Sequence, residues 1–360
     1  MESLQMAEII LKVAVAFCLL ILIHELGHFL VAKYLGIGVE RFSIGFGPKL
    51  ASFRRGETEY MLSVIPLGGY VKLIGDDPRG ADGDHPRAFL NKPIGHRIAV
   101  VAAGPLANFA LAIAIFAGIH WVGVPTPQIS ELPEVGEVVA DSPAQQAGLQ
   151  KGDRILMVDG KPVSKWEDLV QTIHRHINTP LQLRVERGTQ TFDLTVTPKS
   201  GTVIKDLEEV EVGLIGVAPH VDITVMRYSA PIALWKGVEK TWELSALTVV
   251  SLVKMVQGKI SPKHLAGPVG IFQMAGQQAK VGLLPLVSLM AVLSISLGIL
   301  NLFPIPVLDG GHILFFAVEG LWGQPISPRK QEIATQVGLF LLVALMLTAF
   351  YNDLLRIFAN

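Results

Sequence analysis

The residues with the clearest chemical potential form the short motif His24-Glu25-Leu26-Gly27-His28. Side chains at positions i and i+4 of a helix lie on one face, so both imidazoles can bind the same Zn²⁺ ion. Glu25 follows the first histidine and can act as general base toward an attacking water molecule. This HExxH pattern is typical of zinc metalloproteases. We therefore expect His24 and His28 to be metal ligands and Glu25 to be catalytic.

A third ligand must come from elsewhere in the chain, because catalytic zinc usually has three protein ligands and one open position. After the motif, no His, Asp or Glu occurs until Glu40, beyond the apolar segment. Asp309 ends another apolar run and follows two prolines that break a helix. We expect Asp309 to complete a His₂Asp site. His312 could compete as a ligand, but a supporting contact to a ligand is the favoured role.

These residues lie in segments that are apolar enough to cross a membrane. Hydrophobic residues make up 50% of the 360 residues, charged residues only 17%. Apolar runs at 6–32, 98–122 and 283–308 exceed the roughly 20 residues that span a bilayer, and the run at 333–350 approaches that length. We expect a polytopic α-helical membrane protein with about four transmembrane helices. An ionisable group at that depth costs about 2.5–3.5 kcal/mol, which argues against a chance HExxH motif there.

The segments between the apolar runs predict three further elements. Residues 33–96 are rich in glycine and contain two short strands, which predict a membrane-associated β-hairpin region. This region is either an ordinary hairpin or an edge strand offered to an extended substrate. Residues 125–222 have the charges and alternating pattern of an inserted α+β domain. Residues 228–257 mix tryptophans with charges, as an interfacial amphipathic helix does.

The predicted organisation has three parts. An N-terminal membrane half covers 1–124, the inserted domain covers 125–222, and the amphipathic helix with the C-terminal membrane half covers 223–360. Basic residues gather in the loop after the first apolar run and in the loop before the last, so both loops are expected in the cytoplasm. The inserted domain then lies outside. The net charge of -1 argues against a nucleic-acid-binding protein.

The motifs together resemble the site-2 protease family of intramembrane zinc metalloproteases, in particular its bacterial branch around the regulator of sigma-E protease. The resemblance implies that His24, His28 and Asp309 bind zinc and that Glu25 is the catalytic base. It spans nearly the whole membrane part in the family's order. The matching stretches are HELGH at 24–28, FSIGFGP at 42–48, PLGGYVKL at 66–73, GPLAN at 104–108 and NLFPIPVLDGGH at 301–312.

The same resemblance implies roles in substrate binding. Asn301 is expected near the scissile bond, where its amide holds the substrate backbone or stabilises the oxyanion. A hydrogen bond in helix packing is the alternative role. The segments around Gly45 and Gly47 and around Gly68 and Gly69 are expected to pair with an unwound substrate, because a helix hides its peptide bonds.

The family also implies the substrates and the compartment. Its members cleave single-span membrane proteins, such as anti-sigma factors or remnant signal peptides, within or next to the transmembrane segment. We expect a multi-pass protein of the bacterial inner membrane, in contact with the lipid bilayer. The active site is expected towards the cytoplasmic side and the inserted domain on the periplasmic or extracellular side.

The inserted domain resembles a single PDZ domain of the bacterial protease-associated type. Such a domain binds peptides as an added strand, with 135–138 as a candidate wall of the groove. A steric role, in which the domain excludes substrates with large outer domains, is equally open. The matching stretches are Ser142-Pro143-Ala144, Ala147-Gly148-Leu149, Gly152-Asp153-Arg154-Ile155 and Val158-Asp159-Gly160.

Two other classes of protein compete with a protease. A catalytically silent membrane scaffold would bind partners through its PDZ-like domain, but it would not need a complete set of ligands and a base. A metal transporter would need polar residues in series across several helices, and the second and fourth apolar runs contain few. Zinc content and cleavage of a single-span substrate would discriminate among the three.

Overall fold

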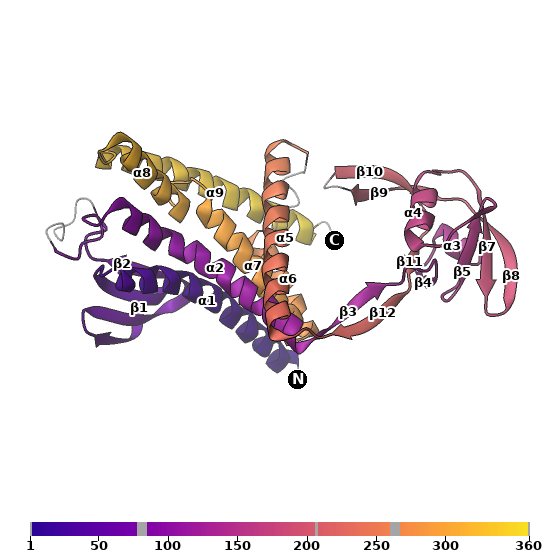
Figure 1. Ribbon diagram of the computed structural model, residues 1–360, viewed down its shortest axis with the longest axis horizontal. Helices are drawn as coiled ribbons and strands as arrows, with labels where there is room; N and C mark the ends of the chain where they lie inside the picture. Colours follow the sequence, from indigo (N-terminus) through magenta and orange to yellow (C-terminus); the bar gives the residue numbers. More distant parts are fainter. Residues whose placement is uncertain (1, 78–84, 206–207, 260–266, 359–360) are drawn as a thin grey trace. The chain divides into compact units, whose positions relative to one another are not determined.

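The computed structural model describes residues 2–77, 85–205, 208–259 and 267–358. The chain forms two compact units. One comprises Met1–Val122 together with Tyr228–Asn360, and the other comprises Gly123–Arg227. The elements of both units are labelled in Figure 1.

The first unit is mainly helical. Among the described residues, four of its helices are long and apolar enough to cross a membrane: α1 (Glu2–Tyr34), α2 (Ile94–Val122), α7 (Leu283–Leu302) and α9 (Pro328–Phe358). They correspond to the four apolar runs predicted from the sequence. The other helices described in this unit are α5 (Ala230–Val256), α6 (Pro268–Val281) and α8 (Asp309–Trp322). The predicted amphipathic helix is α5, and it packs against α2 and α7.

Helix α2 is the centre of this unit, since it packs against α1, α5, α7 and α8 (Figure 1). Small residues allow the close approach. A Cβ atom added to Gly27 of α1 would lie 2.3 Å from the carbonyl oxygen of Ala103 in α2. A Cβ atom on Gly298 of α7 would lie 3.2 Å from the carbonyl oxygen of Pro105. Such small-residue contacts are how apolar helices pack without a hydrophobic driving force between them.

The glycine-rich region forms a folded sheet from β1 (Val39–Arg55) and β2 (Thr58–Leu73). The first half of β1 lies between the two halves of β2, because Ser43 pairs with Met61 on one side and with Tyr70 on the other. The second half of β1 folds back along the start of β2. Both strands are longer than the sequence predicted. Positive φ angles permit the bends: 90° at Gly45, 87° at Gly47 and 130° at Gly68.

The second unit is an α+β fold. Its four-stranded sheet has the order β6 (Lys161–Pro162), β5 (Arg154–Val158), β7 (Leu181–Arg187), β8 (Gln190–Val196). Helices α3 (Pro143–Gln146) and α4 (Trp166–His174) contribute to one apolar core with this sheet. Three two-stranded sheets accompany it. They pair β3 (Val124–Ile129) with β12 (Val221–Met226), β4 (Val135–Val138) with β11 (Val217–Pro219), and β9 (Lys199–Lys205) with β10 (Glu208–Leu214).

The limits of the second unit differ slightly from the sequence estimate of 125–222. The unit runs from Gly123 to Arg227 because β3 and β12 form a ladder that extends to the pair Val124–Met226. These two strands carry no strong change of charge or hydropathy, so composition alone could not locate their ends.

Candidate active site

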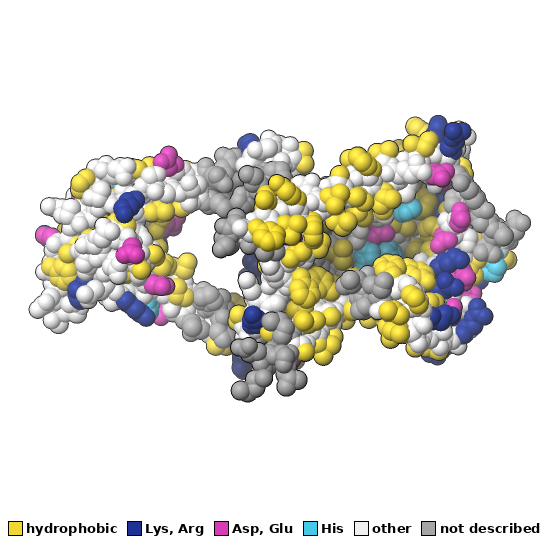
Figure 2. All heavy atoms as spheres, turned by 180° about the vertical axis from the view of Figure 1, so that it is seen from behind, with side chains coloured by type: hydrophobic (Ala, Val, Ile, Leu, Met, Phe, Trp, Pro, Cys, Tyr) yellow, Lys and Arg dark blue, Asp and Glu magenta, His cyan; other side chains and the backbone are white. Residues whose placement is uncertain are grey.

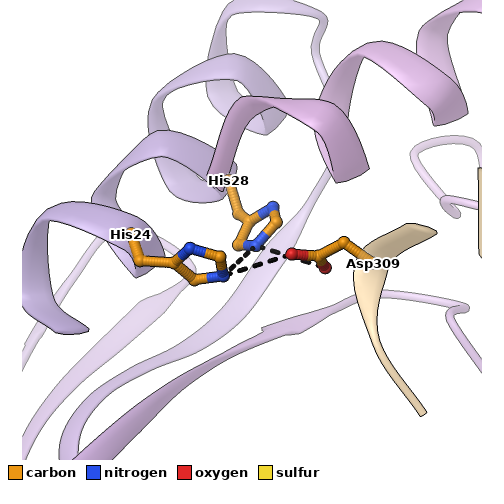
Figure 3. Close-up of side chains that lie close together, drawn as sticks. All are labelled: His24, His28 and Asp309. Atoms are coloured by element: carbon orange, nitrogen blue, oxygen red, sulfur yellow. Dashed lines mark hydrogen bonds and ion pairs between the residues drawn. The ribbon is translucent and has the colours of Figure 1, made fainter. Parts of the chain in front are cut away.

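Three side chains from two distant segments converge in the helical unit. His24 and His28 project from α1, and Asp309 projects from the first turn of α8 (Figure 3). The Nε2 atoms of the two histidines are 3.2 Å apart. Asp309 Oδ2 lies 3.2 Å from His24 Nε2, and Asp309 Oδ1 lies 3.6 Å from His28 Nε2. The structure therefore brings together the three residues that the sequence predicted as ligands.

This donor set fits a zinc ion. Two imidazole nitrogens and a carboxylate oxygen lie within 4.8 Å of one another. Ligand atoms at about 2.0–2.1 Å from a tetrahedral zinc ion would be roughly 3.3 Å apart, close to the spacing observed here. Asp309 Oδ2 is also buried without a hydrogen-bond partner, which is unfavourable unless a further group binds it. Other groups of three or more ligand-type side chains were not found among the described residues.

Helix α2 contacts the Nδ1 atoms of both imidazole rings. His28 Nδ1 lies 2.8 Å from the carbonyl oxygen of Val100 and must donate to it, because a carbonyl only accepts. His24 Nδ1 lies 3.0 Å from the side-chain amide of Asn108. Gly104 provides the space, since a Cβ atom there would lie 2.3 Å from His28 Nε2. In the sequence, GPLAN at 104–108 supported only the family resemblance, and these contacts with the histidines were not predicted.

Glu25 lies beside the edge of the β-sheet. A Cβ atom on Gly69 would be 3.1 Å from Glu25 Cγ and 2.8 Å from the carbonyl oxygen of Ser43. Val71, two residues further along β2, lines the same cavity as Glu25. The end of β2 therefore contacts the predicted general base directly.

His24, Glu25, His28 and Asp309 line one cavity of about 600 Å³. In Figure 2, histidine and acidic side chains are visible inside a recess of a largely hydrophobic surface. Asn301, at the end of α7, also lines the cavity, as does His312. Asp76 lies on the side of the sheet, where burial raises the pKa of its carboxyl group even though the Leu73 N–H donates to it. Further lining side chains are Tyr70, Val71, Phe89, Val307, Phe315 and Gln331.

The four glycines proposed for substrate binding lie in different places. Gly69 is adjacent to Glu25, whereas Gly68 packs against the ring of Phe46. Gly45 and Gly47 occupy the bend within β1. These glycines shape the sheet, but the cavity lining formed by the described residues contains Tyr70 and Val71 instead.

Two features hold Asp309 in place. Gly310 and Gly311 let α8 start tightly against the end of α7, because Cβ atoms there would lie 2.2 Å from Phe303 O and 2.3 Å from Ile305 O. Further along α8, Glu319 forms a bidentate ion pair with Arg97 of α2, with N···O distances of 3.0 and 2.5 Å. The helix that carries the third predicted ligand is thus attached to the helix that supports the other two.

Comparison with known proteins agrees with this geometry. The family model described as peptidase family M50 matches residues 12–345. The regulator of sigma-E protease of Salmonella typhimurium is 34% identical, covering 95% of this chain and 97% of the relative. The Escherichia coli protein of that name is 33% identical with the same coverage. A zinc metalloprotease of Geobacillus kaustophilus is 32% identical, covering 98% of this chain and 99% of the relative.

Solved structures match a smaller part. The PDZ domain of an SdrC-like protein from Listeria monocytogenes covers 26% of this chain and 93% of that chain, with 18% identity and a TM-score of 0.21. The family match and the relatives both extend over nearly the whole sequence, including the HExxH motif and the segment around Asp309. The chain therefore belongs to peptidase family M50 and is a metalloprotease of the site-2 type.

Proposed function

We propose that this protein is an intramembrane zinc protease that hydrolyses peptide bonds within or next to the transmembrane segments of membrane proteins. The observation that carries the proposal is the convergence of His24, His28 and Asp309 beside Glu25, in a cavity between helices that are apolar enough to cross a membrane. Ionisable side chains inside membrane-spanning segments are energetically unfavourable and are usually present only where they serve a function.

His24, His28 and Asp309 would hold the metal. A bound zinc ion would polarise the substrate carbonyl and lower the pKa of water, as it does in other metalloproteases. Glu25 accepts the proton of the attacking water and delivers it to the leaving amine.

The substrate must be extended before it can react, because a helix satisfies and hides its own peptide groups. The end of β2, residues 69–73, lies beside Glu25 and contributes Tyr70 and Val71 to the cavity. An extended substrate segment would add to this end of the sheet as a further strand, which places its peptide bond near the base. The Asn301 amide would then hold the substrate backbone or the developing oxyanion.

The expected substrate class is supported by the relatives, two of which are named regulator of sigma-E protease. We expect single-span membrane proteins, such as anti-sigma factors or remnant signal peptides, in a bacterial inner membrane. The active site would face the cytoplasmic side and the second unit the periplasmic or extracellular side. This unit would act as a PDZ-like domain that either binds a peptide or sterically limits access.

The second unit offers two places for a peptide. A mainly apolar cavity of about 140 Å³ lies between α4 and residues 213–217, next to strand β11. A second cavity of about 650 Å³ is lined by residues 136–138 and 148–151 with Gln145. The first is flanked by a strand and a helix, the arrangement in which a peptide strand is added.

The test is cleavage of a model single-span substrate by the purified protein in detergent, with and without a zinc chelator. Cleavage should stop on chelation and return when zinc is restored. The cleaved bond, mapped by mass spectrometry, should lie within or beside the transmembrane segment. Cleavage that persists without zinc, or that occurs only in the soluble part of the substrate, would contradict the proposal.

A further inference from the structure

Asn108 lies deep in the helical unit and contacts one of the predicted ligands. Its side chain is fully buried, and its amide nitrogen lies 3.0 Å from His24 Nδ1. Its backbone carbonyl accepts a 2.8 Å hydrogen bond from Ser294 Oγ in α7. Its own Oδ1 is buried without any hydrogen-bond partner. A buried polar atom left unpaired usually costs about 1–3 kcal/mol, so its position calls for an explanation.

The explanation lies in the chemistry of a histidine that binds metal through Nε2. That nitrogen must offer its lone pair, so the proton of the neutral ring has to reside on Nδ1. The group facing Nδ1 must then accept a hydrogen bond. For His28 this requirement is met by the Val100 carbonyl, which can only accept.

For His24 the facing group is an amide, which can present either a donor or an acceptor. With the nitrogen toward His24, the proton would lie on Nε2, and that atom could not bind a metal. Turning the amide by 180° exchanges its nearly equal-sized nitrogen and oxygen without moving any other atom. The orphaned oxygen then accepts the Nδ1 proton, and His24 Nε2 keeps its lone pair for a metal.

We propose that Asn108 is a positioning residue that presents its amide oxygen to His24 Nδ1 and so holds the His24 Nε2 lone pair toward the metal. This inference rests on the proposed zinc function. Supporting partners of this kind typically contribute 10–100-fold to metal affinity. Asn108 does not touch the substrate or the reacting atoms in this role.

Two substitutions of similar size separate this role from packing. Asn108→Asp keeps an acceptor and loses the donor, whereas Asn108→Leu keeps the branched shape of the side chain and loses both. Ser294→Ala is the matched control, because it removes the other hydrogen bond at this position but leaves the Asn108 side chain in place. Zinc affinity of the metal-stripped protein would be measured by titration against a competing chromophoric chelator, together with size-exclusion profiles of each variant.

Wild type, Asn108→Asp and Ser294→Ala should bind one zinc ion with affinities within a few-fold of one another. Asn108→Leu should bind about 10–100-fold more weakly. Equal affinity of Asn108→Leu and wild type would overturn the inference and leave the zinc function intact. An equal loss in Asn108→Asp and Asn108→Leu would show that the amide donates, which also overturns it.

Absence of zinc binding by the wild type would overturn the metal site and the inference with it. If Asn108→Leu is not recovered as a monodisperse protein, Asn108→Ala replaces it with the same expected loss. Retained affinity in Asn108→Ala would then overturn the inference.

Discussion

Replacing Arg97 with methionine would leave the Glu319 carboxylate buried between α2 and α8 without its partner. The Arg97 and Glu319 side chains are 7% and 16% exposed, and the pair makes two short contacts. The guanidinium also donates to the Lys92 carbonyl at 3.1 Å and lies 4.7 Å from the centre of the Phe316 ring. Removing one partner of a buried pair typically costs about 3–5 kcal/mol, because the other charge stays uncompensated.

The double variant Arg97→Met with Glu319→Leu should behave differently. It removes both charges, so the uncompensated group disappears and the desolvation penalty with it. What remains lost is the hydrogen bond to the Lys92 carbonyl and the contact with Phe316, the second of which contributes about 0.5–2 kcal/mol. The double variant is therefore expected to be more stable than Arg97→Met by at least about 1 kcal/mol, with a non-additive coupling between the two sites.

Reversible unfolding of the purified protein in mixed micelles would measure these differences, with the wild type and Glu319→Leu completing the cycle. Zinc affinity should follow stability, because the pair attaches α8, which begins with Asp309, to α2. Single variants that lose less than about 1 kcal/mol, with a double variant equal to their sum, would refute the reasoning.

Three further perturbations have expected outcomes. Gly104→Ala should reduce zinc affinity and cleavage at least about 10-fold, because its Cβ would lie 2.3 Å from His28 Nε2; metal titration checks this. Asp353→Leu should destabilise the helical unit by about 1–2 kcal/mol in the same unfolding assay, since the buried carboxylate accepts two backbone N–H groups at the start of α6. Burial disfavours ionised Glu57, but the ion pair with Lys33 prevails and lowers the Glu57 pKa. The stabilisation that ionised Glu57 provides should be present above the pKa of Glu57 in the unfolded chain and should vanish as pH falls through its lowered pKa in the folded protein. The melting temperatures of wild type and Glu57→Gln should therefore converge in acid.

Much of the membrane part follows from local sequence signals. Hydropathy locates the four long helices, and the four-residue spacing of His24 and His28 places both rings on one face of α1. The link to Asp309 is not local, and the only sequence signal for it is an ionisable residue at the end of another apolar run. The prolines at 304 and 306 also predict the break that separates α7 from α8.

The remaining features depend on contacts that no local pattern encodes. The β-sheet folds back on itself because β1 pairs with both halves of β2, and only the positive φ angles at glycines permit those bends. Asn108 has the character of a helix-packing residue in the sequence. Its contact with His24 exists only because α1 and α2 approach closely at Gly27 and Gly104.

The most direct test of the central claim is to replace Glu25 with glutamine and to measure zinc content and cleavage of a single-span substrate on the same samples. Glutamine has the size of glutamate but cannot accept the proton of the attacking water. The variant should retain one zinc ion per chain and lose cleavage by about 10²–10⁴-fold or more. A variant that cleaves at the wild-type rate with zinc bound would contradict the assignment of Glu25 and the mechanism built on it.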